Sequence, residues 1–592
     1  MKLSDYVIDF VAAQGVRHVF MLPGGGAMHL NDSLGRHPGV SFVCNLHEQA
    51  SAIAAEAYAQ YTGNLGVAMV TTGPGGTNAV TGVAGAWLES TPMLFLSGQV
   101  KRPDLVGGRG VRQIGFQEID IVSIVKPITK YAATVTDPAL IRARLEEAVW
   151  HARNGRRGPV WIDLPLDVQA SEIDPDSLEA FVPPAEAPND LGAAAERCLE
   201  ALARSRRPVV LAGNGVRHAG AISDLLRWAE MAGVPVLTTW KALDFLPEDH
   251  PLYAGRPGAV GQRGANFAQQ TADLFISLGA RLDFGQTAYN HGHFAPGAAK
   301  VIVDIDPHEL AKLQMKIDVP VAGDAGRFLK ELLGRTAGRR LPSFADWVGR
   351  CKAWKARYPV VLPAHRESSG GVSNYILVET LGQILAGSDV LVPGSSGACS
   401  EITCQALPVV HGGLRVLNTQ GLGAMGFGPS AAIGACLASG LRRTICIDGD
   451  GGFAMNAQEL ATVARLKLPI KCFVLNNGGY GSIRATQTNY FDRRYMACDP
   501  GSGLTLPDLR KTAEACGVAY RRIASQEKLQ AEIESALDGP GAVLCEVIMA
   551  PDQVTQPKVS SRQEADGRMT TMPMEDLWPF MDRAELEENL SV

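Results

Sequence analysis

Two short polar motifs in the last third of the chain could together hold a metal ion and a diphosphate. Gly449–Gly452 (GDGG) follows the apolar run RTICI, and Asn476–Gly479 (NNGG) follows the apolar run KCFVL. The Asp450 carboxylate and the Asn477 amide would then stand at the tips of two strands, and such oxygen atoms suit Mg²⁺. The neighbouring glycines let backbone N–H groups approach an anion closely, and a helix expected to begin near Asn456 would point its positive end toward it. The glycines of the first motif that we expect beside the anion are Gly449, Gly451 and Gly452. Either motif alone would fit an ordinary tight turn, but the two together on two strand ends favour a diphosphate–metal cradle.

A glutamate near the amino terminus is the second candidate for chemistry. Glu48 follows the strand-like run VSFVCNL and opens the helical stretch EQASAIAAEAYAQ. Its carboxyl group therefore lies at a strand–helix junction, where a ligand can be met. The alternative is a glutamate favoured at this position by the helix dipole alone.

These residues must be positioned by a repeated βα architecture. Glycine-rich clusters separate apolar runs from alanine-rich helical stretches, and the pattern occurs in three blocks of similar size. We expect an α/β fold with three doubly wound parallel-sheet domains, whose ligands lie at the carboxyl ends of strands. The expected domains are residues 1–172, 190–338 and 370–550, followed by a C-terminal arm at 551–592. The runs predicted as strands are VRHVFMLPGG, VSFVCNLHE, LGVAMVTTGPGGTN, PMLFLSGQ and GPVWIDLP in the first block, RPVVLAGNGV, PVLTTW, ADLFISLGARL and KVIVDIDP in the second, and DVLVPGSSG, RTICIDGDGG, PIKCFVLNN and GAVLCEVIM in the third.

Composition excludes several classes of function. The chain has 592 residues and a formal net charge of −6 without long runs of one sign, so neither nucleic acid nor a membrane surface is an expected partner. The 11 cysteines are never spaced C-x-x-C, which fits reduced thiols better than a disulfide framework or a zinc site. The first segment lacks the pattern of a secretory leader. We therefore expect a cytoplasmic protein.

The chain resembles the acetohydroxyacid (acetolactate) synthase branch of the thiamine diphosphate enzymes. The likeness runs from residue 1 to about residue 550. Besides the two motifs above, it includes LPGGGAMHLNDSL, LHEQASAIAAEAYA, TTGPGGTNAVTG, GFQEIDIV, RRGPVWIDLPLDVQ, VDIDP and GLGAMGFG. The three domains would then be a pyrimidine-binding, a middle and a diphosphate-binding domain.

The resemblance implies roles for the candidate residues. Asp450, Asn477 and the Gly479 carbonyl would hold Mg²⁺. Glu48 would bind the pyrimidine ring of the cofactor and support its proton transfer. The aminopyrimidine would be bound by Gly423 and Met425, the catalytic glutamine would be Gln117, and the loop with Gly394, Ser395 and Ser396 would donate to the diphosphate in place of the Gln-His pair common in the synthases.

The resemblance also implies an oligomer. In that family the activating glutamate and the metal-binding motif come from different subunits. We therefore expect a homodimer or a homotetramer with active sites at subunit interfaces, which exclude water from a reactive carbanion.

The resemblance breaks at three positions in the substrate pocket. The family's lysine, tryptophan and arginine fall on Leu166, Thr486 and Gly285, respectively. Loss of the guanidinium removes a clamp for the carboxylate of a second 2-keto acid. The other pocket positions are Gly25, Phe116 and Tyr480.

A flavin is a further expectation. LAGNGVRHAG, GRPGAVGQRGAN and LGARLD resemble the FAD-binding region of the acetohydroxyacid synthases. Gly213 and Gly215 follow a strand as a close-approach turn, and Arg281 could reach a phosphate. Similar middle domains in other thiamine enzymes are empty or bind adenine nucleotides.

The sequence therefore predicts a carboligase that uses thiamine diphosphate, Mg²⁺ and FAD. It would decarboxylate pyruvate and transfer the two-carbon unit to a ketone other than a second 2-keto acid, such as a nucleotide-linked keto sugar, because residues 110–132 look closer to a sugar-modifying subgroup. The alternatives are a conventional acetolactate synthase, a flavin-dependent pyruvate oxidase, and a cofactor-binding or regulatory subunit without catalysis.

Overall fold

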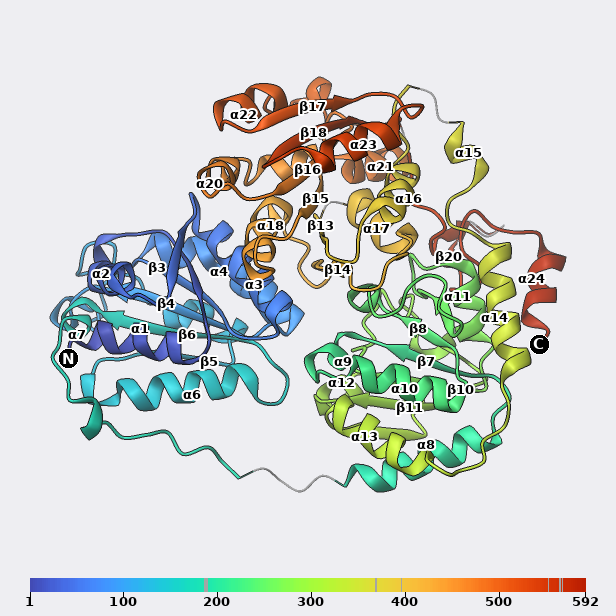
Figure 1. Cartoon of the computed structure of the whole chain (residues 1–592), viewed down its shortest axis with the longest axis horizontal. Helices are drawn as coiled ribbons and strands as arrows, with labels where there is room; N and C mark the ends of the chain where they lie inside the picture. The colour runs from blue at the N-terminus through green and yellow to red at the C-terminus, as the bar shows by residue number, and fades with distance from the viewer. Residues whose placement is uncertain (186–189, 368–369, 396, 552, 564–565, 567) are drawn as a thin grey trace.

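Three parallel sheets dominate the structure, a computed structural model. It describes residues 1–185, 190–367, 370–395, 397–551, 553–563, 566 and 568–592. Within these residues there are three six-stranded sheets, in which every pairing is parallel, and one antiparallel pair of strands. Figure 1 shows them as three α/β units, with the third (orange to red) above the first (blue to cyan) and the second (green to yellow). The predicted fold of three doubly wound α/β domains is confirmed.

The first domain has the strand order β2-β1-β3-β4-β6-β5. Its strands are β1 (His18–Met21), β2 (Ser41–Cys44), β3 (Gly66–Val70), β4 (Met93–Gln99), β5 (Tyr131–Thr134) and β6 (Pro159–Pro165). Its helices are α1 (Leu3–Ala13), α2 (Met28–Arg36), α3 (Glu48–Thr62), α4 (Pro74–Glu89), α5 (Ile121–Val125), α6 (Ile141–Arg153) and α7 (Leu166–Gln169).

The middle domain has the order β12-β11-β10-β7-β8-β9. Its strands are β7 (Pro208–Ala212), β8 (Val236–Thr238), β9 (Tyr253–Gly255), β10 (Leu274–Leu278), β11 (Ala299–Asp304) and β12 (Val319–Ala322). Its helices are α8 (Leu191–Arg204), α9 (Asn214–His218), α10 (Ile222–Ala232), α11 (Arg263–Gln270), α12 (Pro307–Ala311) and α13 (Ala325–Thr336), and α14 (Ala345–Arg357) leads out of the domain.

The third domain has the order β14-β13-β15-β16-β18-β17. Its strands are β13 (Val390–Pro393), β14 (Arg415–Val416), β15 (Thr444–Gly449), β16 (Ile470–Asn476), β17 (Ala519–Ile523) and β18 (Val543–Ile548). Its helices are α15 (Pro363–Arg366), α16 (Asn374–Ile384), α17 (Gly397–Ala406), α18 (Phe427–Ala438), α19 (Asp450–Ala454), α20 (Glu459–Arg465), α21 (Gly481–Tyr490), α22 (Leu509–Ala515) and α23 (Leu529–Asp538).

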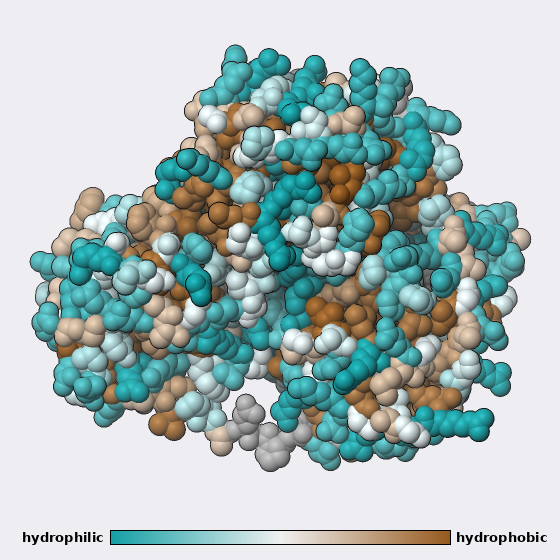
Figure 2. Space-filling model, in the orientation of Figure 1, coloured by the Kyte–Doolittle hydropathy of each residue, from teal (hydrophilic) through white to brown (hydrophobic). Residues whose placement is uncertain are grey.

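The C-terminal segment packs on the middle domain. It forms β19 (Ser561–Gln563), β20 (Met569–Thr571) and α24 (Arg583–Leu590). The Asn266 side chain donates to the Met574 carbonyl at 2.6 Å, and the Trp354 indole donates to Asn589 at 2.7 Å. In the described part of the chain, no helix is long and apolar enough to cross a membrane. Figure 2 shows mostly hydrophilic outer faces, with hydrophobic residues gathered where the domains approach one another.

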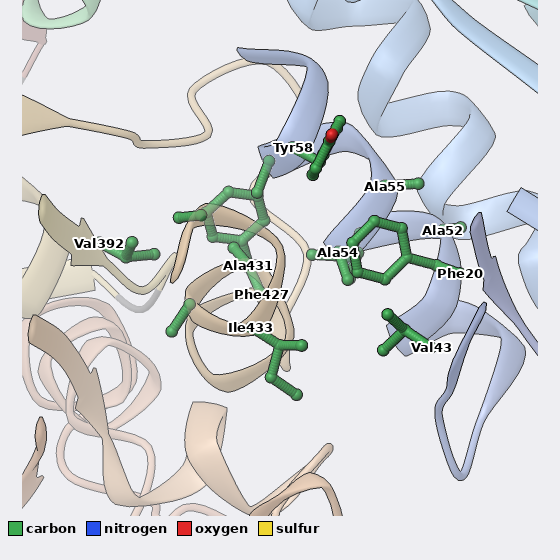
Figure 3. Packing of buried hydrophobic residues seen from close by; sticks show 14 of the residues in the cluster. Phe20, Val43, Ala52, Ala54, Ala55, Tyr58, Val392, Phe427, Ala431 and Ile433 are labelled. Carbon is green, nitrogen blue, oxygen red and sulfur yellow. The ribbon is translucent and has the colours of Figure 1, made fainter. Parts of the chain in front are cut away.

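Two helices rich in small residues join the first domain to the third. α3 and α18 share one apolar core, and Figure 3 shows Ala54 of α3 lying toward the helix that carries Ala431 and Ile433. A Cβ atom on Gly434 would lie 1.9 Å from the Ala54 carbonyl oxygen, so the close approach requires glycine. The sheet of each domain is thus fixed relative to the other through helices whose N-termini lie next to candidate site residues.

Candidate functional site

The GDGG and NNGG motifs meet at the edge of the third sheet. β15 ends at Gly449 and β16 ends at Asn476, and the two strands are neighbours. Asp450 opens α19, and its carboxylate accepts hydrogen bonds from the N–H of Gly451 at 2.8 Å and of Gly479 at 3.0 Å. The expected helix start near Asn456 is wrong, because α19 already begins at Asp450. The Asn456 side chain instead donates to the Gly426 carbonyl at 3.0 Å.

The Asp450 carboxylate lies where a cation would be stabilised. Its side chain is 5% exposed, and burial raises its pKa to about 6, although the surrounding backbone N–H groups favour the charged form. These donors are neutral, so the buried charge would gain from a metal ion. Gly479 has φ 142°, and a Cβ there would lie 2.1 Å from the Cys498 carbonyl oxygen, so only glycine fits. Asn477 lies next to this turn, and its own carbonyl accepts from Arg484 at 3.1 Å.

The predicted diphosphate loop begins at the end of β13. A Cβ on Gly394 would lie 2.2 Å from the Asp448 carboxylate, and the Gly394 N–H donates to Ile447 at 2.6 Å. The Ser395 hydroxyl donates to the Ala424 carbonyl, which ties this loop to the residues expected to bind the pyrimidine. Ser396 lies outside the described residues.

The remaining glycines of GDGG are used within the protein. The Gly449 N–H donates to the Asp448 carboxylate at 2.9 Å. A Cβ on Gly451 would lie 2.4 Å from the Tyr480 ring, so this aromatic residue packs directly on the motif. Gly452 is buried in α19.

Gly423 and Met425 precede α18. Gly423 has φ 64° and open space where a Cβ would point. The Met425 side chain is 36% exposed, and its carbonyl accepts from the Gln49 side chain at 3.4 Å. Because Gln49 follows Glu48 directly, the start of α3 contacts the segment before α18 within one chain.

Glu48 opens α3 with its side chain 5% exposed. His47 caps the helix by accepting the Gln49 N–H at 3.0 Å. The Asn78 side chain, from α4, donates to Glu48 Oε2 at 2.9 Å. Sequence reasoning missed Asn78, since a contact across 30 residues leaves no local pattern.

Comparison with known proteins places the chain in a family. Models of thiamine pyrophosphate enzymes match all three domains: the N-terminal thiamine pyrophosphate (TPP) binding domain at residues 1–124, the central domain at 195–332 and the C-terminal TPP binding domain at 396–547. This chain belongs to the thiamine pyrophosphate enzyme family. Thiamine pyrophosphate is the thiamine diphosphate expected above.

Relatives narrow the family to the acetolactate synthase branch. The chain is 33% identical to a probable acetolactate synthase large subunit of Methanocaldococcus jannaschii, over 93% of this chain and 92% of the relative. It is 36% identical to an acetolactate synthase large subunit of Parasynechococcus marenigrum, over 91% and 86%, and 32% identical to the isozyme 3 large subunit of Escherichia coli, over 90% and 92%. The predicted resemblance is confirmed, and the chain is a TPP-dependent, acetolactate synthase-like carboligase.

In this TPP enzyme, Phe116 and Gln117 lie on an exposed loop of the first domain. Phe116 is 86% exposed, and Gln117 has a positive φ of 64°. The Gln117 carbonyl oxygen packs closely on Gly73, where an added Cβ would lie only 2.3 Å from it. Glu118 holds the loop by accepting N–H groups, including that of Ile114 at 3.1 Å. No motif or spacing in the sequence singled out Glu118.

The other predicted pocket residues come from all three domains. Gly25 is exposed after β1, and Leu166 opens α7 directly after β6. Thr486 is exposed on α21, where its hydroxyl donates to the Ser482 carbonyl at 3.0 Å. Gly285 lies on the loop after β10, and its carbonyl accepts from Ala259 at 2.7 Å.

A cavity of about 740 Å³ lies between the three domains. Gly215, Arg281 and Gly285 line it, whereas Gly213 is not among its lining residues. The reason is that Gly213 packs on the loop after β10, where a Cβ on Gly213 would lie 2.3 Å from the Ala280 Cα atom. Arg281 donates to the Leu88 carbonyl at 2.9 Å, so the middle domain contacts the first domain at this wall.

Proposed function

We propose that this enzyme binds TPP with Mg²⁺ between its first and third domains. Asp450, Asn477 and the Gly479 carbonyl would be the metal ligands, and Ser395 would donate to the diphosphate. The Gly394 N–H is already paired with Ile447, and this glycine would let the loop lie close to Asp448. The buried Asp450 carboxylate, which accepts from neutral N–H groups, supports this assignment, since a cation would offset the cost of its burial.

We place the pyrimidine of TPP between Glu48 and the segment with Gly423 and Met425. The observation that carries the proposal is the 3.4 Å contact from Gln49 to the Met425 carbonyl, which brings these two elements together. When bound, TPP would supply a nucleophilic carbon for attack on the keto group and a cationic ring that accepts the electrons released by decarboxylation. Glu48 holds or releases a proton at its buried carboxyl, and Asn78 orients Oε2 of that carboxyl.

We propose that the reaction joins two pyruvate molecules into acetolactate with loss of CO₂. This proposal is supported by the relatives that the chain matches over most of their length, because they are named acetolactate synthases. Gln117, on the loop fixed by Gly73, would face the substrate.

A second acceptor is favoured by one observation. Leu166, Thr486 and Gly285 carry no charge, so none of them offers a cation to the carboxylate of a second 2-keto acid. A bulkier ketone without that carboxylate, such as a nucleotide-linked keto sugar, would suit such a pocket. The comparisons favour the acetolactate reaction over this one.

We propose FAD as the occupant of the cavity between the domains. Its volume of about 740 Å³ lies in the range of cofactor sites, and Arg281 offers a cation at its wall. The flavin would have a structural role in a carboligase.

We further propose that the protein is a homodimer or a homotetramer with active sites at subunit interfaces. Large apolar side chains are exposed around the site, among them Phe116 at 86%, Leu422 at 40%, Met425 at 36% and Met455 at 46%. A homodimer or homotetramer would bury them. The relatives named large subunits also make a regulatory partner part of this proposal.

Incubation of purified protein with TPP, Mg²⁺ and pyruvate tests the proposal. CO₂ and acetolactate should form in equal amounts. If CO₂ forms only after a keto sugar is added, the second acceptor replaces the first. Bleaching of bound flavin by pyruvate without oxygen would indicate an oxidase, and absence of CO₂ under all conditions would overturn the enzyme assignment.

A further inference from the structure

We propose that Glu459 is a positioning residue that fixes Glu48 in place from the opposite domain. The inference deepens the proposed function and rests on it. Glu459 opens α20 in the third domain and is fully buried. Its Oε1 accepts the Leu46 N–H at 2.8 Å, and its Oε2 accepts the Asn45 side-chain N–H at 2.9 Å. Both donors lie in the segment between β2 and α3, just before Glu48.

The two sides of Glu48 are thus held by the same domain. Before it, Asn45 and Leu46 bind Glu459, and after it, Gln49 contacts the Met425 carbonyl at 3.4 Å. A segment held at both ends cannot shift without breaking contacts on one side. The orientation of the Glu48 carboxyl is therefore set by the third domain as well as by its own helix.

Glu459 also connects this segment to the metal site. α20 follows α19, which begins at Asp450. Asp450 lies at the start of α19 and Glu459 at the start of α20, so this short pair of helices links the proposed metal ligand to the segment before Glu48 of the same chain.

The burial of a carboxyl group with three hydrogen-bond donors indicates specificity rather than simple packing. The Thr462 hydroxyl donates a third hydrogen bond to Glu459 at 2.9 Å. All three donors are neutral, and a buried carboxylate is tolerated only when it is well hydrogen-bonded. An apolar side chain would pack at lower cost but could not direct Leu46 and Asn45.

The geometry provides a conservative variant. The Asn45 Oδ1 atom is buried without a hydrogen-bond partner in the described part of the chain. In Glu459→Gln, rotation of the Asn45 amide would let its Oδ1 accept from the new amide, while the remaining oxygen still accepts from Leu46. Glu459→Ala removes both contacts. Thr462→Val is the matched control, because it removes the third donor but neither contact to the first domain.

The first measurement uses the cofactor-free protein. Amide hydrogen exchange is followed in peptides covering residues 45–50. Glu459→Ala should speed exchange there at least tenfold, whereas Glu459→Gln and Thr462→Val should exchange as the unmodified protein does. Unchanged exchange in Glu459→Ala would overturn the inference.

The second measurement follows deuterium exchange at C2 of bound TPP with TPP and Mg²⁺ saturating. Glu459→Ala should slow this exchange by about 100-fold, since small displacements of a catalytic group cost that much, with Glu459→Gln restoring most of the rate. Equal rates in all variants would overturn the positioning role. If Glu459→Ala does not fold, Asn45→Ala serves instead: slowed exchange supports the role and an unchanged rate refutes it. Should the unmodified protein bind no TPP, the proposed function itself would fail, and that result is distinct from the others.

Discussion

Replacement of Glu48 by Gln is the sharpest test of the proposed chemistry. The two side chains have the same shape, and Glu48 is 5% exposed with Asn78 donating to Oε2 at 2.9 Å. The amide oxygen of the variant can accept the same hydrogen bond, so packing and the Asn78 contact should persist. The variant loses the group that carries and releases a proton.

The size of the effect follows from this difference. A positioned acid–base group contributes about 10²–10⁴-fold to rate, which corresponds to about 3–5 kcal/mol of activation free energy. The free energy of unfolding should change by only about 1 kcal/mol, because the variant keeps the shape of the side chain and an oxygen that accepts from Asn78. We therefore expect CO₂ release from pyruvate to fall by at least 100-fold at saturating TPP while the protein stays folded.

Glu56 offers a matched control on the same helix. It is also buried, and burial raises its pKa to about 8, so at neutral pH it is already uncharged. Glu56→Gln should therefore leave CO₂ release within a few-fold of the original. Continuous CO₂ assays with thermal unfolding of both variants make the comparison. Retention of the full rate in Glu48→Gln would refute the role of Glu48, and equal loss in both variants would point to a general effect of disturbing α3.

Three further predictions concern the proposed metal ligand Asp450, the packing of α3 against α18, and the buried Glu56. Asp450→Asn should weaken Mg²⁺-dependent TPP binding at least tenfold. In the unmodified protein the Mg²⁺ affinity should fall as the pH drops below about 6, because burial raises the pKa of Asp450 to about 6 and protons then compete with the metal. Calorimetric titration measures both effects. Gly434→Ala should destabilise the protein by about 1–3 kcal/mol through overpacking against α3, whereas Gly349→Ala in α14, which has open space around it, should stabilise it by about 0.5–1 kcal/mol in denaturant unfolding. Burial raises the pKa of Glu56 to about 8 in the folded protein, against an ordinary value of 4.5. Between these values the folded state holds a proton that the unfolded state releases, so the free energy of unfolding should fall by up to about 1.4 kcal/mol per pH unit as the pH rises from 4.5 to 8. Glu56→Gln should remove that slope.

The sequence predicted the interior of each sheet better than its edges. All the runs predicted as strands form strands, and they include every central strand of the three sheets. Within the three parallel sheets, the strands that were missed are β5, β9, β12, β14 and β17, and each lies at an edge; the antiparallel pair β19 and β20 in the C-terminal arm was also missed. β9 and β14 have only three and two residues, β12 alternates between buried and exposed positions, and only the last residue of β17 is buried. A strand covered on both faces needs a continuous apolar run, but an edge strand does not.

The site was predictable where it depends on strand ends. The meeting of Asp450 with Gly479 follows from two parallel strands that end at the same edge, and both strands were identified. The start of α19 at Asp450 was missed because its glycines argue against a helix, although the surrounding contacts override that preference. Asn78 and Glu459 were missed for another reason. Their contacts cross 30 and more than 400 residues, so no spacing in the chain records them.

The interface between the first and third domains links stability to catalysis. α3 begins at Glu48 and α18 begins two residues after Met425, and these two helices pack through Ala54 and Gly434. The contact that buries apolar surface is therefore the same one that aligns the proposed pyrimidine site. A substitution deep in this helix pair, far from any substrate, should then lower TPP affinity together with stability. By the reciprocity of linked equilibria, bound TPP should in turn stabilise the packing of α3 against α18.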